Sequence, residues 1–463
     1  MIVADFTLRT GRPARECLWY AADFRNLVDW DASVRSAVKI TEGGLGSGAR
    51  FELRLRAGLR ETTMHYEMLR FAPPHTATLR GEAKGATVVD EIRVEPDGDG
   101  ARLHWHVELL LRDGLAERLA RPWLMHRMRQ AARRLEAVLR PPPSPRLGPV
   151  GRIADRMLLP GAARFTRQGF AAAKLPPITE RAEGLHVAIT GATSGLGEAA
   201  ALMLARRGAR LSIIGRDGDR LRALSQRLRV DSGARPRIIE ADLLDLDAAA
   251  RAADTLAEAD IPDVLINNAG AIFAERGKSA QGFERALAVN LLSPLLIMQR
   301  LAPTMAQGGR VINVVSGGMY LTPLDLDDLQ FTRGRYDGAV AYGRAKRALA
   351  LIGALRAADW PQLAVHAVHP GWADTPGVQS ALPGFRRVMR PFLRNAKQGA
   401  DGMVWLALAA QAAETRRGVW FDRQPHILDV LPRTRLERDR IDTLDRQIDT
   451  LVGQWLSARG VAA

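Results

Sequence analysis

The stretch HVAITGATSGLG, residues 186–197, decides the fold expected for the larger part of this chain. Its first five residues form a short apolar run, typical of a buried strand, which leads directly into a turn with Gly191, Gly195 and Gly197. Glycines at this spacing let the backbone turn tightly and approach a pyrophosphate, which the N-terminus of the following helix attracts. The stretch therefore predicts a strand, a phosphate-binding turn and a helix.

Strand and helix patterns alternate from this stretch onward. A helical pattern follows each of the expected strands, which are HVAIT, LSIIG, RIIEA, DVLIN, RVINVVS and AVHAVHP. Such alternation predicts an α/β fold over residues 185–434, a doubly wound Rossmann-type parallel sheet with right-handed crossovers. Residues 435–463 have a helical apolar period and predict a C-terminal helix.

Residues 1–140 follow a different pattern. Apolar and polar residues alternate in ARFELRLRA, ETTMHYEML, TVVDEIRVE and RLHWHVELLL, with turn residues between these segments. In the last segment, Leu103, Trp105, Val107 and Leu109 share one face, which we expect to point inward. With helical patterns at residues 12–24 and about 115–139, the pattern predicts an α+β domain whose curved antiparallel sheet closes over a long helix.

Residues 141–184 separate the two patterns. The prolines of RPPPSPRLGP predict an extended, semi-rigid linker. The next segment, GRIADRMLLPGAARFTRQGFAAAK, is typical of short basic amphipathic helices. Such helices can lie on a membrane surface, but packing onto the following domain is the favoured interpretation.

The composition indicates a cytoplasmic globular protein. A single cysteine, Cys17, cannot form an intramolecular disulfide and fits a reducing compartment. The start, MIVADFTLRT, lacks the features of a signal peptide, and no apolar run approaches the ~20 residues of a membrane span. The formal net charge is +15, but most basic residues are arginines scattered among apolar positions. We therefore expect no nucleic-acid partner.

A tyrosine and a lysine lie four residues apart in AVAYGRAKRALALIG, residues 339–353. In a helix, Tyr342 and Lys346 share one face. An ammonium group beside a phenol favours the phenolate and so suits acid–base chemistry near neutral pH. A surface helix can also carry such a pair by chance, so the pair gains its weight from the rest of the sequence.

Further motifs follow in the order of a known family. They are Asp242 in EADLL, NNAG at residues 267–270, Asn290 in AVNLL, Ser316 at the end of VINVVS, and HPGWADT at residues 369–375. Together with the T-G-x-x-x-G-x-G turn and the Tyr342 and Lys346 pair, they resemble the short-chain dehydrogenase/reductase family. The resemblance implies an oxidoreductase with a bound nicotinamide dinucleotide.

The resemblance also assigns roles to residues of this chain. Tyr342 is expected to donate a proton to a substrate carbonyl and Ser316 to hydrogen-bond it, because negative charge develops on that oxygen. Lys346 is expected to lower the pKa of the phenol and to hold the nicotinamide ribose, and Asn290 to connect the site to solvent through a water. The expected cofactor-binding residues are Thr190, Gly191, Thr193, Ser194, Gly195, Leu196, Gly197, Arg216, Asp242, Leu243, Asn268, Ala269, Gly270, Tyr342, Lys346, Pro370, Gly371 and Thr375.

The end of the second expected strand, LSIIGRD, indicates NADP(H) as the cofactor. In this fold an acid at that position binds the ribose hydroxyl of NAD and repels the 2′-phosphate of NADP. Gly215 stands where the acid would be, and the guanidinium of Arg216 suits a phosphate. Asp217 favours NAD instead, but we expect it to point to solvent.

An insertion sets the chain apart from most of the family. Ser316 and Tyr342 lie 26 positions apart, so GGMYLTPLDLDDLQFTRGRYDGA, residues 317–339, is longer than usual and is expected at the rim of the substrate site. With FTRQGFAAAK and FDRQP, it resembles the retinol-dehydrogenase-like branch, most closely proteins similar to dehydrogenase/reductase short-chain family member 12. This resemblance implies a lipophilic small-molecule substrate.

The first domain resembles the polyketide cyclase/START-like helix-grip (SRPBCC) family, through NLVDWDASVRSAVKI, GSGARFEL and its final helix. The resemblance implies an apolar cavity that binds lipids or aromatic polyketides. Trp30 and Trp105 are candidate ligand contacts, although core packing is the favoured role for both. His104 and His106 could hold zinc, but no third ligand lies nearby in sequence, and we expect no metal site.

The leading hypothesis is an NADP-dependent oxidoreductase that interconverts a carbonyl and an alcohol, with an N-terminal domain that binds the same lipophilic molecule or a relative. Two alternatives stay open. One is a lipid-binding protein whose dehydrogenase domain is a cofactor-sensing scaffold, and the intact Ser316, Tyr342 and Lys346 set weighs against it. The other is an epimerase or dehydratase on the same fold. Substrate, direction of reaction and assembly as a homo-oligomer are left open by the sequence.

Overall fold

The computed structural model describes residues 1–57, 60–112, 114–140, 162–381, 383–414 and 417–457. The described chain divides into two compact units. The first holds the described residues of Met1–Pro143 with Pro176–Arg181 and Arg229–Ala234, and the second holds the remainder. The proline-rich segment expected to be a linker lies outside the described residues. No described helix is long and apolar enough to cross a membrane.

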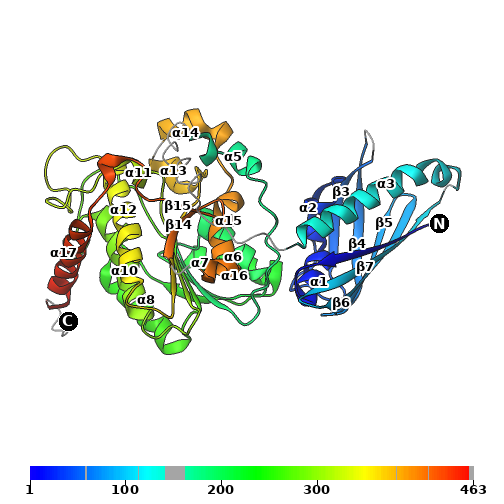
Figure 1. Cartoon of the computed structure of the whole chain (residues 1–463), viewed down its shortest axis with the longest axis horizontal. Helices are drawn as coiled ribbons and strands as arrows, with labels where there is room; N and C mark the ends of the chain where they lie inside the picture. Colours follow the sequence, from blue (N-terminus) through cyan, green and yellow to red (C-terminus); the bar gives the residue numbers. More distant parts are fainter. Residues whose placement is uncertain (58–59, 113, 141–161, 382, 415–416, 458–463) are drawn as a thin grey trace. The chain divides into compact units, whose positions relative to one another are not determined.

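The first unit is an antiparallel sheet with a long helix packed against it (Figure 1). The strand order is β1-β7-β6-β5-β4-β3-β2, and the helix α3 contacts β1 and β7. The strands are β1 (Ile2–Thr10), β2 (Val34–Lys39), β3 (Arg50–Ala57), β4 (Arg60–Ala72), β5 (Thr76–Ala83), β6 (Ala86–Asp97) and β7 (Gly100–Leu111). The helices are α1 (Ala14–Ala22), α2 (Leu27–Trp30) and α3 (Gly114–Val138).

The four strands expected from alternation are confirmed as β3, β4, β6 and β7, and the two helical patterns as α1 and α3. Three further strands, β1, β2 and β5, were not expected. In β5 the signal is weak because Gly81 interrupts it, and glycine lowers strand propensity. The structure requires glycine there, since a Cβ at Gly81 would lie 2.6 Å from the ring of Tyr66 on β4.

Strand β7 shows how alternation builds the core of this unit. Leu103, Trp105, Val107 and Leu109 are all buried, as expected, and the residues between them are more exposed. They join side chains from α1 and from the second half of α3, so one apolar layer fills the space between helix and sheet.

The second unit is an eight-stranded sheet of order β10-β9-β8-β11-β12-β13-β14-β15. All neighbouring strands are parallel except β14 and β15. The strands are β8 (His186–Thr190), β9 (Arg210–Gly215), β10 (Arg237–Glu240), β11 (Val264–Asn267), β12 (Arg310–Val314), β13 (Ala364–His369), β14 (Arg417–Phe421) and β15 (Gln424–His426). The six strands expected from the sequence are confirmed as β8–β13.

The hairpin of β14 and β15 was not expected because its turn lacks the usual sequence signal. Asp422 and Arg423 both adopt positive φ angles, at 47° and 59°. Two-residue hairpin turns of this geometry normally contain glycine or asparagine. Here Asp422 pairs with the buried Arg394, and Arg423 pairs with Asp401, so ion pairs hold a turn that the residue types alone disfavour.

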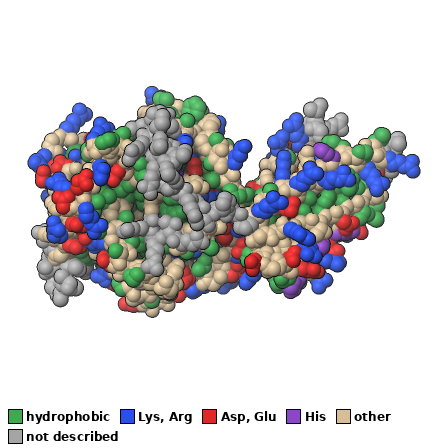
Figure 2. Space-filling model, in the orientation of Figure 1, with side chains coloured by type: hydrophobic (Ala, Val, Ile, Leu, Met, Phe, Trp, Pro, Cys, Tyr) green, Lys and Arg blue, Asp and Glu red, His purple; other side chains and the backbone are tan. Residues whose placement is uncertain are grey.

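Helices cover both faces of the parallel sheet (Figure 1). On one face α8 (Leu246–Ala259), α10 (Ser293–Leu301) and α12 (Gly338–Arg356) form the largest apolar core, which the C-terminal helix α17 (Arg438–Ser457) joins through Leu444, Ile448 and Trp455. On the other face α6 (Gly195–Ala205) packs against α15 (Ala396–Leu408). Figure 2 shows acidic and basic side chains interspersed on the visible surface.

A matched pair of leucines on β7 tests the assignment of the inward face. Leu103 is fully buried and Leu110 is 53% exposed. Leu103→Ala should lower the free energy of unfolding by about 2–5 kcal/mol, because it removes buried methyl groups and leaves a cavity. Leu110→Ala should change it by less than about 0.5 kcal/mol. Urea titration followed by circular dichroism measures both, and equal effects would contradict the assigned register.

Candidate active site

The glycine-rich turn between β8 and α6 lies against the loop after β11. Gly191 has a φ of +64°, and a Cβ at Gly197 would lie 2.5 Å from Nδ2 of Asn268. The Asn268 amide donates to the carbonyl oxygens of Thr190 and Gly191 at 3.0 and 3.1 Å. Hydroxyl Oγ1 of Thr190 in turn accepts from the backbone amides of Asn268 and Ala269. Two motifs 77 residues apart are thereby joined.

Other residues expected to bind cofactor surround the same turn. A Cβ at Gly195 would lie 3.3 Å from the side chain of Thr375, and one at Gly215 would lie 3.2 Å from Thr193. Ser194 is the N-cap of α6, but its side chain makes no capping hydrogen bond. The turn therefore offers the start of α6 and a cradle that side chains would fill, which fits a pyrophosphate.

Ser316, Tyr342 and Lys346 meet at the carboxyl edge of the sheet. Ser316 follows β12, and a side-chain hydrogen bond joins it to Tyr342 on α12. Lys346 lies one turn further along α12, and its Nζ donates to the carbonyl of Val314 at 2.9 Å. The ammonium lies 5.9 Å from the centre of the Tyr342 ring. The structure thus brings together three residues that the sequence spreads over 30 positions.

Asn290 and Gly270 complete this group. A Cβ at Gly270 would lie 2.7 Å from Oδ1 of Asn290 and 3.1 Å from Nζ of Lys346. Asn290 is fully buried in a π-helical turn, Ala288–Leu292, a feature frequent at functional sites. Its amide donates to the carbonyls of Ala271 and Ala286, both at 2.9 Å, and its Oδ1 accepts from the Ala271 amide. Both amide hydrogens of the side chain are thus engaged, whereas Oδ1 has a second lone pair that can accept a hydrogen bond from a water.

The pKa of the Tyr342 phenol is raised in the structure. Burial raises the pKa of the phenol, and the hydrogen bond with Ser316 only partly opposes this effect. Lys346 is not among the causes of this shift, so its expected lowering of the phenol's pKa stays a prediction. Lys346 is itself buried, with a pKa lowered to about 7, so its positive charge is weakly held.

The end of β9 was expected to select the cofactor. There the side chain of Arg216 is exposed to solvent, and Gly215 is buried. Asp217 accepts a hydrogen bond from the backbone amide of Arg220 and pairs with the Arg220 side chain. Asp217 therefore caps the helix α7 (Gly218–Ser232). After the next strand, β10, Asp242 accepts a hydrogen bond from the Leu244 amide in its own turn.

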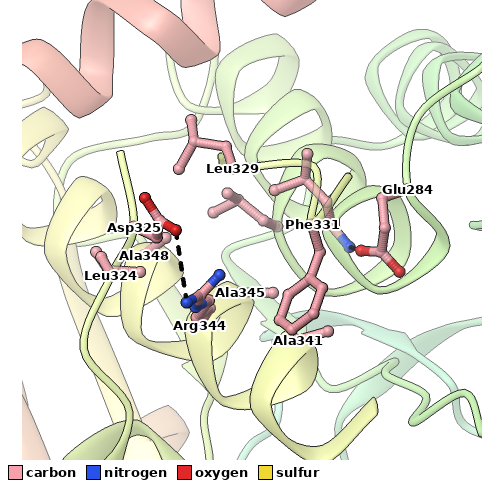
Figure 3. Close-up of a pocket in the computed structure, with 11 residues that line it drawn as sticks. Glu284, Leu324, Asp325, Leu329, Phe331, Ala341, Arg344, Ala345 and Ala348 are labelled. Atoms are coloured by element: carbon pink, nitrogen blue, oxygen red, sulfur yellow. Dashed lines mark hydrogen bonds and ion pairs between the residues drawn. The ribbon is translucent and has the colours of Figure 1, made fainter. Parts of the chain in front are cut away.

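The insertion divides into two parts. Residues of α11 (Gly318–Leu321) and Thr322 lie beside the catalytic helix, since a Cβ at Gly343 would lie 2.6 Å from Oγ1 of Thr322. Residues of the segment 324–331 instead line a pocket together with side chains of α12 (Figure 3). Glu284, Leu287 and Leu291 also line this pocket. There Arg344 lies 3.8 Å from Asp325 and 4.8 Å from the centre of the Phe331 ring. The first part therefore contacts Gly343, the residue after Tyr342.

An aromatic cluster beside the site was missed at the sequence level. Phe165 packs against His369, Trp372 and Phe421, with ring centres 4.6–5.4 Å apart. It comes from the segment before the first strand of this unit, as the expected packing of that segment implied. Buried Arg394 holds this segment through the carbonyls of Phe165 and Thr166. The aromatic residues of HPGW were the available signal.

His369 lies under the loop of Pro370 and Gly371 as a neutral imidazole. Burial lowers its pKa to about 3. Its Nδ1 accepts from the Gly371 amide at 2.8 Å, so the proton resides on Nε2. A Cβ at Gly317, next to Ser316, would lie 2.8 Å from that nitrogen. The ring therefore packs between the loop of HPGW and the turn that carries Ser316.

The two candidate histidines of β7 take part in local contacts. His104 Nδ1 lies 3.1 Å from Thr7 Oγ1, and His106 Nδ1 lies 2.6 Å from Asp5 Oδ1. Within the part of the chain that the structure describes, no group of three His, Cys, Asp or Glu residues is placed to hold a metal ion.

The lowered pKa of Lys346 predicts how pH changes stability. The pKa of Lys346 falls from 10.5 in the unfolded chain to about 7 in the folded chain. The buried charge therefore destabilises the fold to its full extent below pH 7. This destabilisation decreases as the pH rises and is lost at about pH 10.5. Lys346→Met should therefore raise the free energy of unfolding by about 3 kcal/mol more near pH 6 than near pH 9.5. Exposed Lys397→Met is the control for urea titrations. If the gain in free energy of unfolding did not depend on pH, the lowered pKa of Lys346 would be contradicted.

Comparisons with known proteins agree with this geometry. A family model described as short chain dehydrogenase matches residues 185–384, and one described as polyketide cyclase / dehydrase and lipid transport matches residues 9–140. A putative daunorubicin C-13 ketoreductase of Streptomyces is 37% identical over 52% of this chain and 84% of its own length. Human dehydrogenase/reductase SDR family member 12 is 33% identical over 57% of this chain and 86% of its own.

A third relative, human retinol dehydrogenase 12, is 33% identical over 51% of this chain and 77% of its own length. The three relatives match this chain over most of their own sequences. The expected oxidoreductase fold therefore has sequence support as well as geometric support. The chain belongs to the short-chain dehydrogenase/reductase family of oxidoreductases and carries an N-terminal polyketide cyclase-like domain.

Proposed function

We propose that the chain uses NADP(H) to interconvert a carbonyl and an alcohol on a lipophilic molecule. The observation that carries this proposal is the convergence of Ser316, Tyr342, Lys346 and Asn290 beside the glycine-rich turn. A bound nicotinamide would supply or accept the hydride. Thr190, Gly191 and Asn268 would hold its pyrophosphate side, and Lys346 its ribose, within the cradle formed by the turn.

The raised pKa of Tyr342 suits carbonyl reduction. A phenol whose pKa lies above its ordinary value keeps its proton at neutral pH. Its Oη can therefore deliver that proton to a carbonyl oxygen as negative charge develops there, while Ser316 hydrogen-bonds the same oxygen. Lys346, with a pKa of about 7, can exchange a proton near neutral pH and restore the phenol.

A lipophilic substrate is supported by the relatives. Beside the HPGW loop, the partly exposed Trp372 packs against the buried Phe165. The names of two relatives refer to a ketoreductase of daunorubicin and to a dehydrogenase of retinol, that is, to a ketone and an alcohol on molecules that carry large ring systems or hydrocarbon chains. For the first unit, the match to a lipid-transport model supports a role in binding the same molecule or a relative.

NADP(H) is proposed over NAD(H) because of the strand end at Gly215. No acidic side chain stands at that position. The nearest one in sequence, Asp217, is occupied at the N-terminus of α7, and Glu240 lies opposite Gly215 on β10. Arg216 is exposed and its guanidinium suits a 2′-phosphate.

The proposed proton donor is tested by Tyr342→Phe, which removes the hydroxyl and keeps the ring. Reduction of daunorubicin or all-trans-retinal with NADPH should slow by ~10² to 10⁴, while NADPH affinity stays within about twofold. Tyr20→Phe, in the first unit, removes a hydroxyl that donates to Asp29 and serves as the control. Wild-type turnover by the Tyr342 variant would remove that residue from the mechanism.

The cofactor assignment is tested by titrating NADPH and NADH into the wild type and Arg216→Ala. Loss of a charge-assisted phosphate contact should weaken NADPH binding by about 10- to 100-fold and leave NADH binding nearly unchanged. Exposed Arg237, at the amino end of β10, supplies the control Arg237→Ala because it lies at the opposite edge of the sheet. Tighter binding of NADH by the wild type would overturn the assignment.

A further inference from the structure

A carboxylic acid is buried in the apolar core of the first unit. Asp90 lies on the inward face of β6, in line with Val88, Ile92 and Val94, and is 4% exposed. A fourth apolar residue would continue this face. The acid therefore breaks the pattern that builds the core.

Indole and phenol groups surround this acid. Trp105 Nε1 donates to Asp90 Oδ1 at 2.9 Å, and a side-chain hydrogen bond joins the Tyr66 hydroxyl to the carboxyl group. Oδ2 of Asp90 is buried and has no hydrogen bond of ordinary geometry among the described residues. Nε1 of Trp30 is buried and unbonded in the same way, and its ring packs 5.4 Å from that of Trp105.

The acid has no cation to compensate it. None of the ion pairs between described residues includes Asp90, and Arg127 on α3 pairs instead with Asp31 at 3.2 Å. Burial raises the pKa of Asp90 to about 6, and the nearby charge of Asp31 adds to this effect. A buried carboxylate without a counter-ion destabilises a fold, so stability does not explain the residue.

The packing holds the group in place. Gly81 on β5 leaves room for the Tyr66 ring, which also packs edge-on against Phe24 with centres 4.7 Å apart. The middle of α3 seals this core less tightly than its C-terminal part. Leu124, Met125 and Met128 are only partly buried, and flexible methionines can move aside for a ligand.

We propose that Asp90 and Trp30 form the polar end of a ligand site inside the first unit, and that the ligand is an apolar molecule bearing a hydroxyl group. Oδ2 of Asp90 accepts a hydrogen bond from that hydroxyl, and the Trp30 indole donates to its oxygen. The apolar remainder of the ligand lies toward α3. This inference rests on the proposed function, in which the unit binds a lipophilic molecule, and adds the group that it recognises.

The test compares two probes of similar shape, 1-naphthol and 1-methylnaphthalene, by equilibrium dialysis against the full-length chain near pH 8. The wild type should bind the naphthol about tenfold more tightly, as expected for a hydrogen bond to a charged acceptor. Asp90→Asn replaces the accepting oxygen with a donor and should reduce this preference to within about twofold. Asp5→Asn, on the exposed face of the sheet, should leave it unchanged.

Calorimetry of the same variants separates recognition from loss of the fold. Because the folded pKa of Asp90 is raised, the destabilisation is fully present above pH 6 and is lost as pH falls toward 4. Asp90→Asn should therefore raise the melting temperature at pH 8 and have little effect near pH 4. A more stable variant with a reduced preference supports the site.

Two outcomes overturn the inference in different ways. In the first outcome, the wild type binds both probes equally, or Asp90→Asn keeps the preference for the naphthol. Asp90 then does not recognise the hydroxyl group, although the first unit still binds an apolar ligand. Failure of the wild type to bind either probe removes ligand binding by the first unit as well.

Discussion

The side-chain amide of Asn268 ties the glycine-rich turn to the central strand of the sheet. It donates to two carbonyls of that turn at 3.0 and 3.1 Å, while the neighbouring Asn267 donates to Asn313 Oδ1 on β12 at 2.9 Å. These two side-chain amides donate to oxygens in a buried position, in place of water. Without such donors, the unpaired oxygens would destabilise the fold. Through them β8, β11 and β12 end at one level, and the residues that follow each strand share one edge. The residues that we propose to be catalytic depend on this shared edge.

Two buried arginines extend the same principle to segments remote in sequence. Arg347, on the helix of Tyr342 and Lys346, is fully buried and contacts Asp429 and the carbonyls of Met319 and Thr434. Arg394 similarly joins Asp422 to the segment of Phe165. Each guanidinium bonds several acceptors in the loops, so loops before and after the sheet are held against it. Arg394 in particular holds Phe165 in the aromatic cluster.

The electrostatics of the two units follow one rule. In both, the polar groups proposed to act on a ligand are buried away from full counter-charges, and burial shifts their pKa values. Lys346 has a pKa of about 7 and Asp90 of about 6 for this reason. Such positions cost stability, whereas most of the core residues around them are apolar and tightly packed. Stability and proposed chemistry are therefore supplied by different residues of the same core.

Local sequence determined most of the secondary structure and the identity of the site. Six strands of the parallel sheet follow from apolar runs, and spacing alone put Tyr342 and Lys346 on one helical face. The β14–β15 hairpin did not follow, because ion pairs to Arg394 and Asp401 hold its turn. Only tertiary structure decided the pKa values of Tyr342 and Lys346, the course of the insertion, and the meeting of Asp90 with Trp105 and Tyr66. Periodicity reports which face of an element is apolar, but burial and pairing arise from residues distant in sequence, and these set the energy of every charge.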